Sequence, residues 1–435
     1  MLGPSTSQSA GTTATFELTD AQSRLRDKAA SSATHILGVG GSRSGKTFGF
    51  CYCVATRALM APASRHLICR LQNIDVRQSV MMDTWPNMMR KAYPGVPMRW
   101  NRSDQYCILP DDSEVWFLGL DDKERVEKIL GKEYATIYPN EVSQIAYETI
   151  LTLRTRLAQK AFKRDGRSLD LKMYYDLNPT GRGHWTHSEF IEGKSPVDHM
   201  PLDITRRAHE FLNPGDNPHL PQAYLDELDA LPERQRQRFR DGKYLSEVPG
   251  TLWPLSRIEA LRRPAHPPLK RVVIGVDPSG SDGVGGDSQG IVVVGLGVDD
   301  EAYVLADLSC RLSPEGWARV VARAALLFGA DRIVAERNYG GAMVEAVLRA
   351  AETSLPVTLV TASRGKHLRA EPVAAIYEQK RAHHVGNFTE LEEQMGMMTT
   401  AGYQGGASPD RLDALVWALT ELMLPADTSH TFAFG

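Results

Sequence analysis

Short apolar runs alternate with stretches of helical apolar spacing through the first part of the chain. His35–Val39 and Leu171–Leu177 have the length and composition of buried strands, and Phe48–Met60 repeats its apolar residues as a helix does. Cys107–Pro110 and Val115–Leu118 read as a hairpin. The alternation predicts an α/β fold with an open, mainly parallel sheet and helices on both faces.

A second series of strands follows a proline-rich stretch. Arg271–Asp277, Ile291–Gly295 and Ala302–Leu308 are successive apolar runs, and a helical segment separates them from Arg332–Glu336. Three consecutive strands, then a helix and a further strand, are the opening of an RNase H-like (RuvC-like) sheet. The chain therefore carries two α/β units of different topology.

The pattern also predicts the boundaries of these parts. We expect residues 1–200 to carry the first sheet behind a loose N-terminal arm, 201–267 to form a lid or linker, and 268–435 to carry the second sheet. Residues 234–240 contain a run of arginines on one helix. Such a run fits either a solvated face or a surface that meets the DNA backbone.

Composition narrows the class of protein. The chain has 435 residues, 42% hydrophobic and 24% charged, with a net charge of −3, which excludes a uniformly basic DNA-coating protein. No apolar run approaches the roughly 20 residues of a membrane span. The five cysteines lack metal-like or disulfide-like spacing, which suits a reducing cytoplasm.

A complete phosphate-loop motif lies between the first strand and its helix. It consists of Gly40, Gly41, Ser42, Arg43, Ser44, Gly45, Lys46 and Thr47. Its backbone N–H groups would cradle phosphates at a helix N-terminus. Lys46 would reach the β- and γ-phosphates, and the Thr47 hydroxyl would ligate Mg²⁺. The sequence therefore predicts a P-loop domain that binds a nucleoside triphosphate.

Two later strands end in polar residues suited to this site. The strand that ends at Asn140-Glu141 resembles a Walker B element, with Glu141 as general base and Asn140 where an Asp is usual. Asn178 follows the next strand and could sense the γ-phosphate. Upstream, Gln22 could read adenine or be an ordinary surface residue.

Acidic residues stand at the ends of the second set of elements. They are Asp277, Glu336, Asp410 and Asp413. Carboxylates placed in this way can converge on two divalent ions about 3.5–4 Å apart, the arrangement that hydrolyses phosphodiesters. Oxygen-only ligands favour Mg²⁺ or Mn²⁺ over zinc. Ser363–Arg369 reads as a basic loop that could contact DNA phosphates or simply be solvated.

This series of motifs resembles the large terminase subunit of a tailed bacteriophage. The resemblance runs from about Leu18 to Leu422 and rests on the order of the motifs rather than on any single one. The motifs are Gly40–Thr47, Glu141, Asn178-Pro179 with Trp185, Asn217-Pro218, Asp277, Glu336-Arg337-Asn338 with Gly340-Gly341, and Asp413-Ala414-Leu415.

The resemblance implies an ATP-driven motor that threads double-stranded DNA through a portal protein into a procapsid, and an endonuclease that cuts concatemeric DNA. It implies a small terminase subunit as partner, a ring on the portal, and action in the cytoplasm of the infected bacterial host. Arg43 resembles the arginine that stabilises charge in cis in this family. Arg154 or Arg156 could instead act in trans from a neighbouring subunit, and the sequence does not choose between them.

The same resemblance assigns Asn178 to coupling and Asp277, Glu336 and Asp413 to a metal triad, with Asp410 as a spare ligand. Asn140 departs from the family pattern and puts the Mg²⁺ shell in doubt. Two other interpretations remain at this stage. One is a helicase-nuclease of DNA repair or recombination, although no second RecA-like half is visible, and the other is a non-catalytic, nucleotide-switched DNA-binding scaffold.

Overall fold

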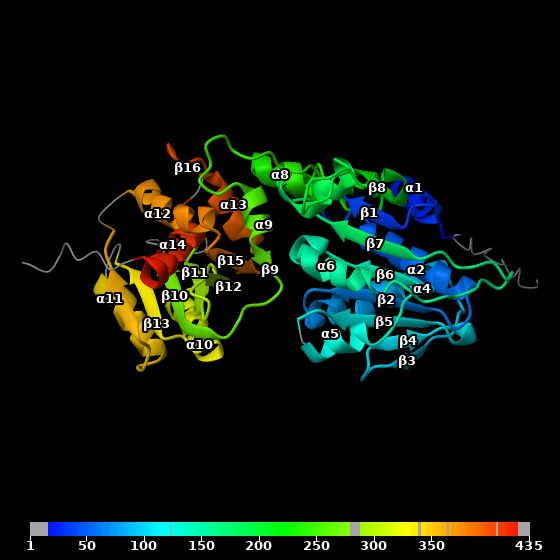
Figure 1. Ribbon diagram of the computed structural model, residues 1–435, viewed down its shortest axis with the longest axis horizontal. Coiled ribbons are helices and arrows are strands. Elements are labelled where there is room, and N and C mark those ends of the chain that lie inside the picture. The colour runs from blue at the N-terminus through cyan, green and yellow to red at the C-terminus, as the bar shows by residue number, and fades with distance from the viewer. Residues whose placement is uncertain are drawn as a thin grey trace, which may run out of the picture.

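Two α/β halves, each built on its own sheet, make up the computed structural model of the chain (Figure 1). It describes residues 16–121, 123–278, 288–337, 341–362, 365–405 and 408–424. The N-terminal half is drawn in blue to green and the C-terminal half in yellow to red. Among the described helices, none is both long and apolar enough to cross a membrane.

The sheet of the N-terminal half has eight strands in the described residues, in the order β3-β4-β5-β2-β6-β7-β1-β8. They are β1 (His35–Val39), β2 (Arg65–Arg70), β3 (Arg99–Asn101), β4 (Tyr106–Ile108), β5 (Glu114–Gly119), β6 (Thr136–Pro139), β7 (Lys172–Leu177) and β8 (Arg207–Phe211). Among these eight described strands, only the pairs β3–β4 and β4–β5 are antiparallel. The predicted mainly parallel sheet and the β4–β5 hairpin are both confirmed.

Successive β1 residues face opposite cores, because side chains alternate across a strand. Ile36 packs with the helices on one face, and Leu37 and Val39 with those on the other. The first group is α1 (Asp20–Ala30), α2 (Lys46–Met60) and α4 (Trp85–Ala92), and the second is α5 (Lys123–Leu130) and α6 (Tyr147–Arg154).

The C-terminal half has a seven-stranded sheet in the described residues, in the order β14-β13-β10-β11-β12-β15-β9. The strands are β9 (Arg262–Arg263), β10 (Leu269–Asp277), β11 (Gly290–Gly297), β12 (Ala302–Asp307), β13 (Arg332–Glu336), β14 (Val357–Val360) and β15 (Ala382–Val385). The strands β10, β11 and β12 form an antiparallel meander, and β13, β14, β15 and β9 join in parallel. This is the predicted RNase H-like arrangement.

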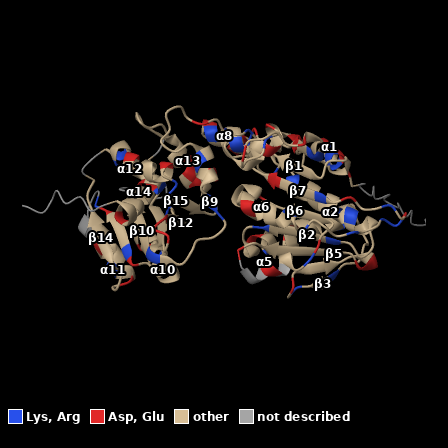
Figure 2. Ribbon diagram, viewed as in Figure 1, with Lys and Arg blue, Asp and Glu red and all other residues tan. Residues whose placement is uncertain are grey.

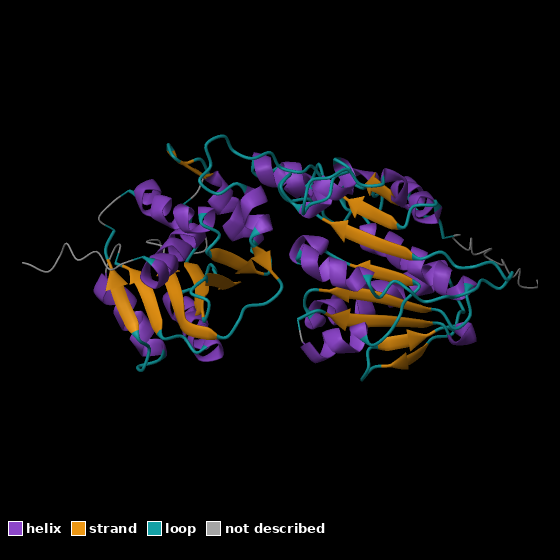
Figure 3. Ribbon diagram, in the orientation of Figure 1, coloured by secondary structure: helices purple, strands orange, loops and turns teal. Residues whose placement is uncertain are grey.

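Helices again cover both faces of this second sheet (Figure 3). One face carries α10 (Pro314–Phe328) and α11 (Gly341–Ala351). The other carries α12 (Lys366–Glu378), α13 (Thr389–Met397) and α14 (Asp410–Met423). A small antiparallel pair, β16 (Met398–Thr399) with β17 (Gly402–Tyr403), lies beside α13.

The segment 201–267, expected as a lid or linker, is divided between the two sheets. Its β8 pairs with β1, and its β9 pairs with β15. Between them run α7 (Gln222–Asp229), α8 (Glu233–Phe239) and α9 (Leu255–Ala260). The proline-rich stretch at residues 262–268 therefore begins inside the second sheet, because its first two residues form β9.

Three arginines in or directly after α8 form ion pairs within the molecule. Arg236 pairs with Glu233 at 2.5 Å and Arg240 with Asp229 at 2.9 Å. Arg238 is buried and pairs at 2.6 Å with Glu393 of the C-terminal half. Figure 2 shows acidic positions interspersed with basic ones over both halves. The buried Arg238 thus contacts the C-terminal half, and a DNA-facing role for the other arginines of this run stays a prediction.

Candidate functional site

The phosphate loop follows β1 and runs directly into α2, as the motif requires. Gly40 and Gly45 have φ angles of 155° and 89°, and a Cβ on Gly40 would lie 1.8 Å from the Leu212 carbonyl oxygen. The Ser42 N–H donates to the Phe239 carbonyl at 2.9 Å. The chain after β8 and the end of α8 thus enclose the loop so tightly that glycine is required.

Lys46 is buried at the centre of this loop. Its Nζ donates to the carbonyls of Gly40 (3.0 Å) and Gly41 (2.7 Å), to Ser44 Oγ (3.1 Å) and to Asn178 Oδ1 (3.0 Å). Burial lowers the pKa of Lys46, and the nearby carboxylates of Asp176 and Glu141 act in the opposite direction. The structure therefore brings together the two residues predicted to bind and to sense phosphate.

Gln22 of α1 braces the same loop from outside. It is buried, and its Nε2 donates to the Gly45 carbonyl at 3.2 Å. Its Oε1 accepts from the Thr19 N–H, which completes a capping box at the start of α1. Gln22 is thus no ordinary surface residue, and adenine reading stays a prediction.

Asp176, which sequence reasoning missed, joins the Walker B segment to the phosphate loop. It is fully buried near the carboxyl end of β7, where its Oδ2 accepts from Thr47 Oγ1 at 3.2 Å. Its Oδ1 accepts from Asn140 Nδ2 at 2.8 Å and from the Glu141 N–H at 2.9 Å. An acid inside an otherwise apolar strand was the available signal, because charged residues are seldom fully buried without a purpose.

Glu141 itself has a strained backbone and a perturbed carboxyl. Its φ of 57° lies in the left-handed region, which is uncommon for residues other than glycine and often marks a functional position. Burial and the neighbouring Asp176 carboxylate raise the pKa of Glu141. A raised pKa makes the carboxylate a better proton acceptor, as a general base requires.

The three candidate arginines lie in different surroundings. Arg43 is exposed, with its guanidinium 5.8 Å from the ring of Tyr224 in α7. Arg154 is held by Glu189 at 2.8 Å. Arg156 donates to the Leu130 carbonyl at 2.9 Å. Its own carbonyl accepts from the N–H of Tyr134, two residues before β6 begins. Arg156 thus lies at the amino end of β6, whereas Glu141 follows the carboxyl end.

The predicted acidic residues of the C-terminal half are all buried, and they share one region. Asp277 ends β10, Glu336 ends the adjacent parallel strand β13, and Asp410 and Asp413 lie in the first turn of α14. Ser288 donates to Asp410 Oδ2 at 3.1 Å. Segments 279–287, 338–340 and 363–364 lie outside the described residues, and Asn338 and Gly340 of the family motif are among them.

Two basic side chains of α12 lie among these carboxylates. Lys366 Nζ forms an ion pair with Asp413 Oδ2 and donates to Ser408 Oγ at 2.9 Å. Arg369 lies 3.5 Å from Glu336 and 3.6 Å from Asp413. The part of the predicted basic loop from Lys366 onward is instead the start of α12, and two of its positive charges contact the carboxylates.

The chemistry of this cluster suits a divalent cation, although its present geometry does not form a ready site. In the described residues, no three carboxylate, histidine or cysteine side chains are arranged to hold a metal ion. Burial raises the pKa of Asp277 and Asp413, and mutual repulsion among the carboxylates raises that of Asp277 further. A buried group of hard oxygen donors that repel one another matches the ligands that Mg²⁺ or Mn²⁺ prefers.

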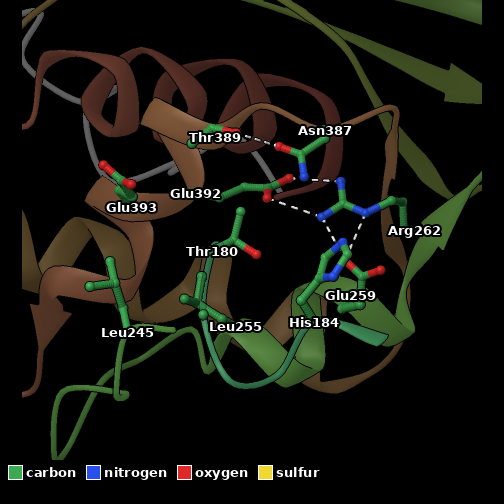
Figure 4. A pocket seen from close by; sticks show the side chains of 11 residues that line it. Thr180, His184, Leu245, Leu255, Glu259, Arg262, Asn387, Thr389, Glu392 and Glu393 are labelled. Atoms are coloured by element: carbon green, nitrogen blue, oxygen red, sulfur yellow. Dashed lines mark hydrogen bonds and ion pairs between the residues drawn. The ribbon is translucent and has the colours of Figure 1, made fainter. Parts of the chain in front are cut away.

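The two halves of the chain lie close together near Glu141 and near the loop that follows Asn178. Asn387 of the C-terminal half donates to the Ser143 carbonyl, two residues after Glu141. Figure 4 shows the neighbouring pocket, where Arg262 and Glu392 lie beside Thr180 and His184 of the N-terminal half. The loop that follows Asn178 therefore lines a pocket together with residues of the C-terminal half.

Comparison with known proteins gives matches to both halves. A family model described as phage terminase large subunit matches residues 32–243, and one described as terminase RNaseH-like domain matches residues 274–422. A search of curated proteins finds no match.

Solved structures similar to this chain include large terminases from two sources. One, from a thermophilic bacteriophage, has 13% identity and a TM-score of 0.47, covering 94% of this chain and all of the other. The same protein in complex with ADP has 14% identity to this chain and a TM-score of 0.46, with the same coverage of both chains. The large terminase of bacteriophage HK97 has 12% identity and a TM-score of 0.36, and the match covers 93% of this chain and 95% of the other.

The two family matches follow each other in the order of the two sheets. The first covers the phosphate loop, Glu141 and Asn178, and the second covers Asp277, Glu336 and Asp413. A helicase-nuclease or a non-catalytic scaffold is not favoured by these matches. With an ATPase domain followed by an RNase H-like nuclease domain, the chain belongs to the phage large terminase family.

Proposed function

We propose that this chain is a DNA-packaging motor in which ATP hydrolysis drives double-stranded DNA into a procapsid and a two-metal endonuclease cuts concatemeric DNA. One observation carries the proposal. A single chain holds a phosphate loop joined to Asn178 and, in a separate RNase H-like sheet, a buried carboxylate cluster.

In the ATPase half, Lys46 and the loop N–H groups would bind the phosphates of ATP, and Thr47 would contact its Mg²⁺. Glu141 would accept a proton from the attacking water, which its raised pKa supports. Asn178, which already holds Lys46, would respond to the loss of the γ-phosphate. Arg43 would turn from Tyr224 to the phosphates to stabilise charge in cis.

Arg156 is assigned a role in trans, on a neighbouring subunit of a ring. Its position at the amino end of β6 supports this assignment, because phosphates on the loop lie at the opposite end of the parallel strands. Arg154 is less suited, since Glu189 already neutralises it.

In the nuclease half, Asp277, Glu336 and Asp413 would hold the metal ions, with Asp410 as an additional ligand. The ions, Mg²⁺ or Mn²⁺, would supply an activated water and stabilise the leaving oxygen of the phosphodiester. Trp417 donates to Glu336 Oε2 at 3.0 Å and would keep that carboxylate oriented.

The assembly we propose includes the small terminase subunit and the portal protein of the procapsid, on which this chain forms a ring. It would act in the cytoplasm of the infected bacterial host. We divide the chain into an ATPase half (1–200), a lid and linker (201–267) and a nuclease half (268–435), with β8 and β9 anchoring the middle part to the two sheets.

Paired substitutions test the two activities separately. Glu141→Gln is expected to abolish ATP hydrolysis and leave Mn²⁺-dependent nicking of supercoiled plasmid intact, and Asp277→Ala to do the reverse. Glu148→Gln and Asp300→Ala, both at exposed acids, are the matched controls. Full metal-dependent nicking by Asp277→Ala would remove the nuclease assignment.

A further inference from the structure

The acid normally found next to the Walker B glutamate is absent from its usual place in this chain. Asn140 occupies that position at the end of β6 and is buried. Its Nδ2 lies 3.2 Å from Thr47 Oγ1 and 2.8 Å from Asp176 Oδ1. The side of the amide that faces the loop is therefore a hydrogen-bond donor, which cannot ligate a cation.

A carboxylate nevertheless lies beside the magnesium-binding hydroxyl. Asp176 Oδ2 is 3.2 Å from Thr47 Oγ1, and the side chain comes from β7, the strand between β6 and β1. Asp176 is level with Gly38 in the register of β1 and β7, close to the start of the phosphate loop. The charge required near Mg²⁺ is thus present, but on a neighbouring strand.

We propose that Asp176 takes the place of the Walker B acid and holds the Mg²⁺ of bound Mg·ATP, directly or through a water, while Asn140 positions it. This inference rests on the proposed ATPase function. The hydrogen bonds from Asn140 and from the Glu141 N–H both reach Oδ1, which leaves Oδ2 directed toward Thr47. Asn140 thus acts through Asp176, as a positioning residue.

The arrangement also connects the cation to the base. The Glu141 N–H donates to Asp176, so a shift of the Asp176 carboxylate on binding Mg·ATP would be felt at the backbone of the general base. The bond thus ends on a residue whose φ of 57° lies in the left-handed region. A purely structural Asp176 would brace the Glu141 turn equally with and without Mg²⁺.

The test measures binding of a fluorescent ATP analogue to the full chain, with Mg²⁺ and with EDTA. We expect Asp176→Asn to reduce the Mg²⁺-dependent gain in affinity about tenfold or more, as for loss of a charged ligand, with affinity in EDTA changed less than about twofold. Asp170→Asn, at an exposed acid just before β7, is the matched control and should behave as wild type.

An exchange variant, Asn140→Asp with Asp176→Asn, keeps one acid and one amide at the site. It should recover most of the Mg²⁺ gain, and it serves as the test if Asp176→Asn alone does not fold. Wild-type chain that bound no ATP would refute the ATPase function itself. A Mg²⁺ gain that is unchanged in Asp176→Asn, or absent from a folded exchange variant, would refute only the role of Asp176.

Discussion

Replacing Arg262 by methionine removes the cation from a buried charge cluster near the contact between the two halves. The Arg262 guanidinium binds both carboxylate oxygens of Glu392, at 2.9 and 3.0 Å, and Glu259 at 2.9 Å. It also donates to the Gly386 carbonyl. Methionine fills a similar volume but leaves two carboxylates and one carbonyl without this partner.

The cost follows from the burial of both charges. The side chains of Arg262 and Glu392 are 4% and 9% exposed, so little water can replace the lost contacts. Breaking a buried pair by removing one partner costs about 3–5 kcal/mol. For a domain of this size each kcal/mol lowers Tm by about 2–4 °C, so we expect a loss of about 6–20 °C.

Thermal unfolding followed by circular dichroism at pH 7 measures this loss, with Arg349→Met as control. Arg349 pairs with Glu345 at 2.9 Å on the solvent side of α11, and such exposed pairs contribute about 0.3–0.5 kcal/mol. Burial opposes ionisation of Glu392, but Arg262 and His384 hold its pKa below the usual range. The stabilisation of the folded state by ionised Glu392 is therefore fully present above the ordinary glutamate pKa of about 4.3, and it is lost as pH falls below that value.

Two results would refute this reasoning. One is an Arg262→Met variant whose Tm falls no further than that of Arg349→Met, which would mean that water replaces the guanidinium. The other is a wild-type chain that does not lose stability below pH 4, which would mean that Glu392 is protonated in the folded state.

Three further predictions concern the carboxylate cluster. Lys366→Met should raise Mn²⁺ affinity about tenfold by titration calorimetry, since the metal no longer competes with the ammonium for Asp413; equal affinity would contradict this. Asp277→Asn should raise the Tm of the metal-free protein. The pKa of Asp277 is raised by folding, so the folded state loses stability as pH rises from the ordinary Asp pKa to the raised pKa, and Asn removes this loss. An unchanged Tm at pH 8 would contradict the prediction. Trp417→Phe should lower the free energy of unfolding in denaturant by about 1.5–3 kcal/mol, because Glu336 loses its bond from the indole N–H; an unchanged free energy would contradict this.

The order of strands and motifs could be predicted because both leave local patterns. The P-loop glycines, the apolar run before Asp277 and the turn between β4 and β5 each depend on neighbours in sequence. These patterns were sufficient for both sheets and for the family.

Contacts between distant segments could not be predicted in the same way. Asp176 lies 129 residues from Thr47, and its role depends on the placement of β7 between β6 and β1, which no local pattern specifies. The basic residues at Lys366 and Arg369 read as solvated or DNA-facing until the fold places the carboxylates around them. Buried charge is recognised only when its partner is known.

The tight enclosure of the phosphate loop has a consequence for how the chain can be made and divided. A Cβ on Gly242 would lie 2.7 Å from Gly40 Cα, so the segment after α8 forms part of the wall around the loop. A nascent chain synthesised only as far as β7 can pair β1 with β7. It still lacks β8, on the other side of β1, and the segment that encloses the phosphate loop. Nucleotide binding should therefore appear late in synthesis, and an ATPase fragment must continue beyond Lys243 rather than stop at residue 200.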